Sequence, residues 1–336
     1  MDLHDKVRGC FLGLAIGDAL GKPVETKKAA EIASKWGRIT DYFVNVDHKY
    51  YDGTPAGSWT DDTQLSLAVA RGFVNSGSFD LDAIAEEHCV EFMKTIAGWG
   101  TTTKDAVAKM VDGTHWSNAS LTDQPNRGTG NGVSMKIAPV GLYMGLTNPN
   151  CFNPQWTEDT KKIVKLSIMT HFTSMAITSG FAQAFAVFKC FTSDPKTFDL
   201  PSFIRTITGA GMMGRRYLFK TITADDIANR LGLLEKYEEY PPERIIQELK
   251  GTCYVYDSLP FTFMFFVRNP HSIDCLYDCV SAGGDADTNG SQIGALLGAL
   301  HGTEIFPKHL IDGLQEKDEI LKTADKFYER FKKEQK

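Results

Sequence analysis

The chain has 336 residues, of which 42% are hydrophobic and 23% are charged, and its formal net charge is −6. This composition is typical of a soluble globular protein with ample material for a hydrophobic core. The acidic balance argues against a phosphate-neutralising basic surface, so we expect no nucleic-acid partner.

The seven cysteines are scattered along the chain and include no C-x-x-C pair. An odd, dispersed set indicates reduced thiols in a cytosolic protein rather than a disulfide framework or a zinc site. The apolar run at residues 11–16 is too short to span a membrane, and no cleavable signal pattern precedes it. The sequence therefore predicts a cytoplasmic protein without a membrane anchor.

Hydrophobic residues at helical spacing predict helices along most of the chain. The first covers residues 7–20, where Gly9, Gly13 and Gly17 form a small-residue stripe, and we interpret Gly9 and Gly13 as close helix-packing positions. His88 falls among core positions and is predicted to be a structural histidine with satisfied hydrogen bonds. Further helices are expected at residues 61–75, 79–96, 104–110, 160–171, 174–190, 200–208, 224–238 and 243–249.

The remaining segments complete an all-α prediction. Residues 35–58 are irregular and aromatic, which indicates a surface loop or lid. Residues 261–267 read as a core helix with Pro260 in its first turn, and residues 312–336 as an amphipathic helix that closes the fold. Because no strand series, linker or repeat interrupts this pattern, we expect one compact many-helix domain over residues 1–336.

Two acidic turns, far apart in the sequence, each lie near glycine and lead into an apolar helix. Their oxygen-bearing residues are Thr60, Asp61 and Asp62 in the first turn, and Asp285, Asp287 and Thr288 in the second. Carboxylate and hydroxyl oxygens suit Mg²⁺, Mn²⁺ or Ca²⁺, and four carboxylates in one place repel unless cations lie between them. Each turn, taken alone, is as consistent with a simple helix N-cap as with a metal site. A calcium loop of the EF-hand type is excluded, because its twelfth position is Leu296 instead of glutamate.

Two glycine-rich segments, residues 98–103 and 127–135, each run into a helical or apolar stretch. Exposed backbone N–H groups in such segments bind anions, although glycine-rich turns usually only redirect the chain. Together with the two acidic turns, they favour a phosphate-bearing ligand held next to metal.

These blocks resemble the ADP-ribosylglycohydrolase family, which includes the dinitrogenase-reductase-activating glycohydrolases and the ADP-ribosyl-acceptor hydrolases. The resemblance rests on residues 8–21 with Glu25, 57–63, 130–139, 170–171 and 283–288, which occur in family order. It implies an all-α fold with two Mg²⁺ or Mn²⁺ ions.

The resemblance also implies a role for individual residues. The metal ligands would be Thr60, Asp61, Asp62, Asp285, Asp287 and Thr288. The substrate would be bound by Gly98, Gly100, Thr101, Gly130, Asn131, Gly132, Ser134, Met135 and His171. Two residues depart from the family pattern: Ala286 replaces the threonine between the aspartates, and Lys136 stands where arginine is frequent.

The implied reaction cleaves the bond between C1 of the distal ribose of ADP-ribose and an acceptor. Its transition state has oxocarbenium character, and two metals would fix the ribose hydroxyls and lower the pKa of a water molecule. Asp62 or Asp287 is the candidate base. Glu25, on a segment over the metals, is the candidate acid, and the alternative for Glu25 is a surface salt bridge with Lys22 or Lys27.

Several functions share these motifs. The first is reversal of mono-ADP-ribosylation on protein arginine, and the alternatives are a hydrolase of serine-linked or polymeric ADP-ribose and a non-catalytic ADP-ribose-binding relative. A two-metal phosphatase or nucleotide hydrolase is a third class. Since all six ligand positions are filled, we favour catalysis, with ADP-ribose and an ADP-ribosylated protein or small molecule as partners.

Overall fold

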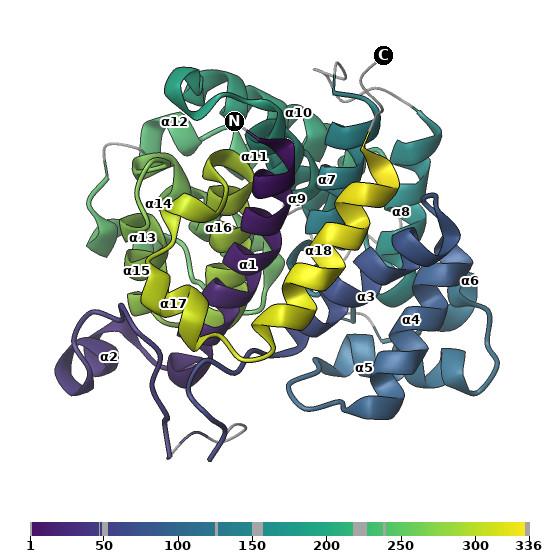
Figure 1. The fold of residues 1–336 in the computed structure, drawn as a ribbon, viewed down its shortest axis with the longest axis horizontal. Coiled ribbons are helices and arrows are strands. Elements are labelled where there is room, and N and C mark those ends of the chain that lie inside the picture. Colours follow the sequence, from purple (N-terminus) through teal and green to yellow (C-terminus); the bar gives the residue numbers. More distant parts are fainter. Residues whose placement is uncertain are drawn as a thin grey trace.

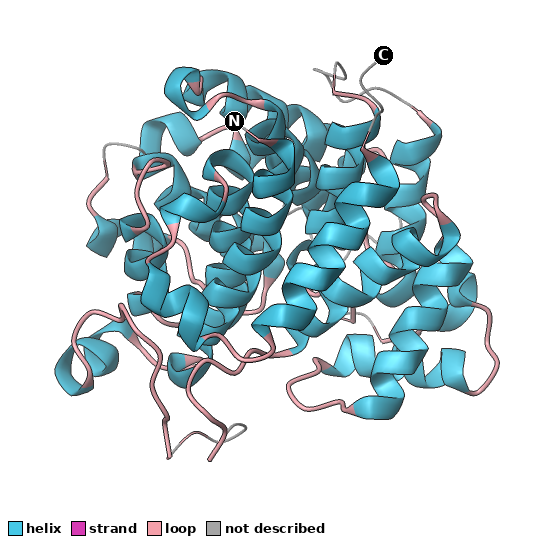
Figure 2. Ribbon diagram, in the orientation of Figure 1, coloured by secondary structure: helices cyan, strands magenta, loops and turns pink. Residues whose placement is uncertain are grey.

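The computed structural model describes residues 2–46, 48, 53–124, 127–149, 157–217, 227–237 and 240–332. Within these residues the chain forms helices and no strand, which confirms the predicted all-α class (Figures 1 and 2). Two isolated bridges, Lys28 with Gly283 and Gly130 with Tyr254, are the β-type contacts among the described residues. Both bridges lie next to the predicted site.

The α-helices are listed here in chain order with their bounds: α1 (Leu3–Gly21), α2 (Ala29–Lys35), α3 (Asp61–Ser76), α4 (Leu81–Lys94), α5 (Thr101–Val111), α6 (Trp116–Ala119), α7 (Ala138–Thr147), α8 (Glu158–Thr170), α9 (Ser174–Thr192), α10 (Leu200–Arg215), α11 (Ile227–Leu231), α12 (Leu234–Tyr237), α13 (Pro242–Glu248), α14 (Val255–Arg268), α15 (Asp274–Ser281), α16 (Ala286–His301), α17 (Lys308–Gly313) and α18 (Lys317–Phe331). Short 3₁₀ turns are η1 (Lys22–Val24), η2 (Ser134–Lys136), η3 (Pro195–Thr197) and η4 (Thr303–Ile305).

Helices α1 and α16 pack antiparallel with their backbones in contact (Figure 1). A Cβ atom on Gly13 would overlap the carbonyl oxygen of Gly294, and one on Gly17 would overlap that of Gly290. Only glycine permits this approach, because any side chain would force the backbones apart. The pairing brings the C-terminal end of α1 to the N-terminal end of α16, although these ends are more than 260 residues apart in the sequence.

The C-terminal helix α18 packs against α1 and α3 (Figure 1). Its Phe327 ring lies 5.9 Å from that of Phe11 in α1 and 5.8 Å from that of Phe73 in α3, both in edge-to-face geometry. Aromatic pairs of this kind add to the free energy gained from burial. Helix α18 therefore ties together the two helices whose ends approach the site.

Three helix predictions are wrong in detail. The closing helix, predicted over residues 312–336, is α18 and begins at Lys317, because Glu316 takes a left-handed φ of 54° that separates it from α17; residues 333–336 lie outside the described part. The predicted helix over residues 224–238 is two short helices in its described part, α11 and α12, separated at Gly232, a residue that weakens a helix; residues 224–226 and 238 lie outside the described residues. Pro260 lies inside α14 instead of in its first turn. Helix α14 begins earlier because the bridge between Gly130 and Tyr254 fixes the chain in extended form just before Val255.

The loop predicted at residues 35–58 has no helix in residues 36–46 and 53–58, and residues 47 and 49–52 lie outside the described part. Short helices α2, α6 and α17 have no counterpart in the predictions. The six described cysteines form no disulfide. Among the described residues, no helix has the length and apolar character needed to cross a bilayer.

Candidate active site

A cavity of about 410 Å³ opens where the end of α1 meets the starts of α3, α5 and α16. Most of the predicted site residues line it: Glu25, Asp61, Asp62, Gly98, Gly100, Thr101, Gly130, Asn131, Gly132, Met135, His171, Asp285, Asp287 and Thr288. The two remaining ones, Thr60 and Ser134, are buried and outside the set of residues that line the cavity. The structure thus gathers segments from the whole chain around one space.

The start of α3 is held by a carboxylate from another helix. Asp18 in α1 is fully buried and accepts hydrogen bonds from the backbone N–H groups of Thr60 and Thr63, at 2.9 and 3.0 Å. It also accepts from their hydroxyl groups, at 2.8 and 2.6 Å. A negative charge here satisfies the unpaired N–H groups of the first turn and complements the helix dipole. Asp18 therefore fixes the turn that carries Asp61 and Asp62.

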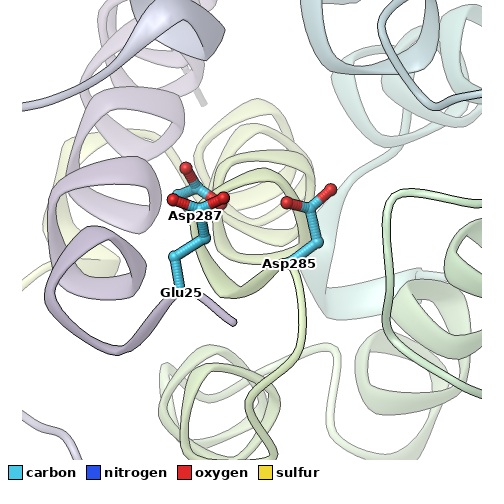
Figure 3. A group of neighbouring side chains, drawn as sticks. All are labelled: Glu25, Asp285 and Asp287. Carbon is cyan, nitrogen blue, oxygen red and sulfur yellow. The ribbon is translucent and has the colours of Figure 1, made fainter. Parts of the chain in front are cut away.

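The start of α16 is held by two glycines in left-handed conformation. Gly283 and Gly284 have φ angles of 74° and 79°, which L-residues rarely adopt. The Gly284 carbonyl accepts from the N–H of Thr26 at 2.6 Å, and its own N–H donates to the carbonyl of Lys27 at 2.9 Å. These bonds bring the segment after α1, with Glu25 at its start, against the turn that carries Asp285 and Asp287 (Figure 3).

The two acidic turns meet in the cavity. Glu25, Asp285 and Asp287 each place one carboxylate oxygen within 4.8 Å of the others (Figure 3). The Thr288 hydroxyl donates to Oδ2 of Asp62 at 3.2 Å, which links the second turn directly to the first. The structure therefore brings these two distant turns together in one cavity.

Burial and mutual repulsion disfavour the charged form of the carboxylates in the cluster. Burial, and then the charges of Asp18 and Asp285, raise the pKa of Asp61 to about 7. Burial, followed by Asp18 and Asp61, raises the pKa of Asp62 well above its usual range, and burial followed by Glu25 does the same for Asp287. Cations between these oxygens would remove the repulsion.

The donor set fits hard divalent cations. Oδ1 of Asp62 is buried and has no hydrogen-bond partner among the described residues. The Thr60 hydroxyl donates its proton to Asp18, and its oxygen lies 3.4 Å from Oδ2 of Asp62 and 3.5 Å from Oδ2 of Asp287, so its lone pairs remain available on the cluster side. Buried oxygens without partners are costly in an apolar surrounding, and Mg²⁺ and Mn²⁺ take ligands of this type.

Asn131 joins the second glycine-rich segment to the acidic cluster. Its backbone N–H donates to the carbonyl of Cys253 at 3.0 Å, and its side-chain amide donates to Oδ2 of Asp285 at 2.5 Å. Ser134, which we predicted to bind substrate, lies outside the cavity lining and stabilises this segment by hydrogen bonds. Its hydroxyl donates to the carbonyl of Asn131 at 3.0 Å and accepts from the Gln292 amide at 2.9 Å.

Cys253 and Tyr254 line the cavity and were not predicted from the sequence; only the bridge between Gly130 and Tyr254 explains why they reach it. Arg127 and Thr103, which also line it, lie within the two predicted glycine-rich segments. His88 is buried outside the cavity lining, as predicted, and its Nδ1 lies 2.8 Å from the carbonyl of Ile84. The prediction that it is fully satisfied is wrong, because its Nε2 has no partner among the described residues.

The chain is similar to proteins with named activities. The family model described as ADP-ribosylglycohydrolase matches residues 1–336. An ADP-ribosyl-[dinitrogen reductase] glycohydrolase from Rhodospirillum rubrum is 28% identical, with 94% of this chain and 92% of the relative covered. The ADP-ribosylhydrolase ARH3 of Gallus gallus is 24% identical over 97% of this chain and 93% of its own.

Two further similarities extend this pattern. An ADP-ribosylarginine hydrolase Tri1 from Pseudomonas putida (strain GB-1) is 22% identical, with 97% of this chain and 78% of the relative covered. A solved structure titled as an ADP-ribosylglycohydrolase-related protein complex superimposes with a TM-score of 0.69 at 21% identity, covering 98% of each chain. This last likeness shows the same fold. The chain therefore belongs to the ADP-ribosylglycohydrolase family and is a glycosidic-bond hydrolase.

Proposed function

We propose that this enzyme releases ADP-ribose from ADP-ribosylated arginine side chains of proteins, using two divalent cations. The observation that carries the proposal is the meeting of the two acidic turns in a cavity of about 410 Å³, which is large enough for a nucleotide-sized ligand. The preference for arginine draws on the relative named as an ADP-ribosylarginine hydrolase.

Thr60, Asp61 and Asp62 would hold the cations from one side, and Asp285, Asp287 and Thr288 from the other. When bound, the cations supply positive charge that offsets the buried carboxylates, orients the ribose 2- and 3-hydroxyl groups and lowers the pKa of a nearby water molecule. The all-oxygen donor set suits either Mg²⁺ or Mn²⁺.

The diphosphate would lie against the glycine-rich segments. Helix α5 begins at Thr101 after the N-cap residue Gly100, so no cap side chain covers its first N–H groups, and its first turn lines the cavity. A helix start of this kind binds phosphate oxygens. Arg127, which also lines the cavity and pairs with Asp105, adds positive charge on the same side.

In the reaction, a water molecule attacks C1 of the distal ribose while the bond from C1 to the acceptor atom breaks, and its electron pair leaves with the acceptor. Asp62 is the stronger candidate for the base that takes the water proton, because its Oδ1 has no hydrogen-bond partner among the described residues. Glu25, beside Asp287, would give a proton to the leaving acceptor. The products are ADP-ribose and the unmodified acceptor.

The test is release of free ADP-ribose from arginine-linked and serine-linked ADP-ribosyl peptides. The assay would be run with Mg²⁺, with Mn²⁺ and with chelator, and repeated with the Asp61→Asn and Asp287→Asn variants. We expect release from the arginine peptide that needs metal and is lost in both variants. Release from the serine peptide alone would reassign the acceptor, AMP release would indicate a nucleotide hydrolase, and binding without release would indicate a non-catalytic relative.

A further inference from the structure

A buried lysine lies behind the cavity wall and reaches the site through a threonine. Lys136 has no exposed surface, and its Nζ donates a hydrogen bond to Oγ1 of Thr170 at 3.0 Å. Oγ1 of Thr170 also lies 2.9 Å from Nδ1 of His171. Of the three residues, only His171 lines the cavity.

The hydroxyl of Thr170 has one proton to donate. Its oxygen has two lone pairs, and one of them accepts from Lys136, whose ammonium group can only donate. Among the described residues, Nδ1 of His171 is the acceptor within hydrogen-bond distance of this hydroxyl. The arrangement therefore favours donation from Thr170 to Nδ1, which places the single proton of the neutral imidazole on Nε2.

The charge distribution keeps the imidazole neutral. Burial, followed by the positive charges of Lys136 and Arg127, lowers the pKa of His171 to about 3. Burial lowers the pKa of Lys136 to about 7, against the charge of Asp61, which raises it. Among the described residues, Lys136 forms no salt bridge, and its side-chain hydrogen bond is the one to Thr170.

The Nε2 edge of the ring lies against the second glycine-rich segment. A Cβ atom on Gly132 would come within 2.9 Å of Nε2 and 2.6 Å of Cε1 of His171, and one on Gly130 would lie 3.9 Å from Nε2. The glycine at position 132 thus lets the ring edge reach the cavity wall. An N–H group at this edge is suited to an acceptor oxygen of a ligand, either a hydroxyl or a phosphate oxygen.

We propose that Lys136 and Thr170 are positioning residues that hold His171 as the neutral tautomer protonated on Nε2. His171 then serves as a fixed hydrogen-bond donor to an oxygen of the ADP-ribosyl ligand and takes no part in proton transfer. The identity of the ligand rests on the proposed function, whereas the tautomer is a property of the protein itself.

The tautomer can be read directly by long-range ¹H–¹⁵N NMR on protein labelled at histidine, at a pH below 7 where Lys136 is charged. The His171 signals are assigned by their loss in His171→Gln. We expect protonated Nε2 and unprotonated Nδ1 in the unaltered protein. In Thr170→Val, which keeps the shape of the side chain and removes the hydroxyl, we expect the proton to be distributed over both ring nitrogens of His171. Thr170→Ser should restore protonation on Nε2.

Titration calorimetry with free ADP-ribose gives the functional readout. Loss of one fixed donor should raise Kd about tenfold in Thr170→Val, and Thr170→Ser should bind like the unaltered protein. Lys136→Met, which replaces a buried charge by an apolar side chain of similar length and is tolerated in many cores, should match Thr170→Val in both measurements. Circular dichroism establishes that each variant is folded.

A histidine protonated on Nδ1, a cationic histidine, or an unchanged tautomer and Kd in folded Thr170→Val and Lys136→Met would overturn the inference. The NMR result does not depend on turnover. Failure to cleave any ADP-ribosyl peptide would therefore count against the proposed function and leave the tautomer assignment standing.

Discussion

The Asp18 carboxylate in α1 accepts hydrogen bonds from both the backbone N–H and the hydroxyl of Thr60, at 2.9 and 2.8 Å. Thr60 is the N-cap residue of α3, yet its own side chain makes no capping bond. The cap therefore comes from a different helix, and it sets the direction of the Thr60 oxygen toward the acidic cluster.

Replacing Asp18 by alanine should lower both stability and metal affinity. Loss of a cap costs about 1–2 kcal/mol of unfolding free energy, and the freed Thr60 hydroxyl would no longer hold its lone pairs toward Asp62. Urea unfolding and Mn²⁺ titration measure the two effects. Asp80→Ala, which removes the cap of α4 away from the cavity, is the matched control and should reduce stability alone. Equal Mn²⁺ affinity in both variants would show that Asp18 has no influence on the cluster.

The glycine contact between α1 and α16 should tolerate no side chain. A methyl group on Gly17 would overlap the Gly290 carbonyl oxygen, so Gly17→Ala should destabilise the protein by about 1–3 kcal/mol or more, as overpacking does. Gly232→Ala, at an exposed turn where the added atom meets only ordinary contacts, should unfold at nearly the same urea concentration as the unaltered protein. Similar midpoints for the two variants would mean that the helices separate at little cost.

Chelated protein should lose stability as pH rises from about 4 to about 7. Burial raises the pKa of Asp61 from its ordinary value of 3.8 to about 7, so the folded chain binds more protons than the unfolded chain in this interval. The free energy of unfolding should fall by about 1.4 kcal/mol per pH unit for each additional proton that the folded chain binds. Saturating Mn²⁺ should reverse the trend, because the metal binds the ionised carboxylates. Urea unfolding at several pH values checks this, and a flat profile with chelator would contradict it.

Glu25→Gln should reduce kcat by about 10²–10⁴, the range for loss of a general acid. The amide keeps the size of the side chain but has no proton to give at neutral pH. Glu31→Gln is the control, since Glu31 pairs with Lys27 at 3.4 Å and does not line the cavity. Single-turnover measurements separate chemistry from product release. Unchanged kcat in Glu25→Gln would remove Glu25 from the mechanism.

Gln64 should influence ligand affinity without touching the ligand. Its Oε1 accepts from the indole N–H of Trp99 at 2.8 Å, and its Nε2 donates to Glu91 at 2.9 Å, so it ties the segment around Gly98 and Gly100 to α3. Gln64→Leu should raise Kd for ADP-ribose about tenfold by leaving the buried indole N–H without an acceptor. Trp99 fluorescence reports the loosened contact. Gln247→Leu, at an exposed position of α13, should behave like the unaltered protein.

The helices and the acidic turns were predictable because their signals are local. Periodic apolar residues place α3 and α9, and the aspartates at 61, 62, 285 and 287 are recognisable as oxygen ligands in the sequence itself. Their meeting in one cavity followed from charge chemistry together with the family resemblance. Four carboxylates in one place need a shared countercharge, and this requirement links turns that are far apart in the chain.

The parts that escaped prediction depend on tertiary contacts. Asp18 lies 42 positions before Thr60, so its capping role has no local signature. Tyr254 reaches the cavity through its bridge with Gly130. Pro260 was expected in a first turn, but the bridge between Gly130 and Tyr254 holds the chain extended just before Val255, so α14 begins there and Pro260 lies inside it. The environment of Lys136 likewise arises only when η2 packs beside the end of α8.

A crystal structure with Mn²⁺, recorded at a wavelength where manganese scatters anomalously, would show directly whether the two acidic turns bind two metal ions. We expect two anomalous peaks in the cavity, one or both touching Asp61, Asp62, Asp285 and Asp287, with Thr60 and Thr288 as further ligands. Asp287→Asn crystals should lose at least one peak. Absence of anomalous density in the cavity at saturating Mn²⁺, or peaks confined to other acidic surfaces, would contradict the assignment of this cavity as a two-metal hydrolase site.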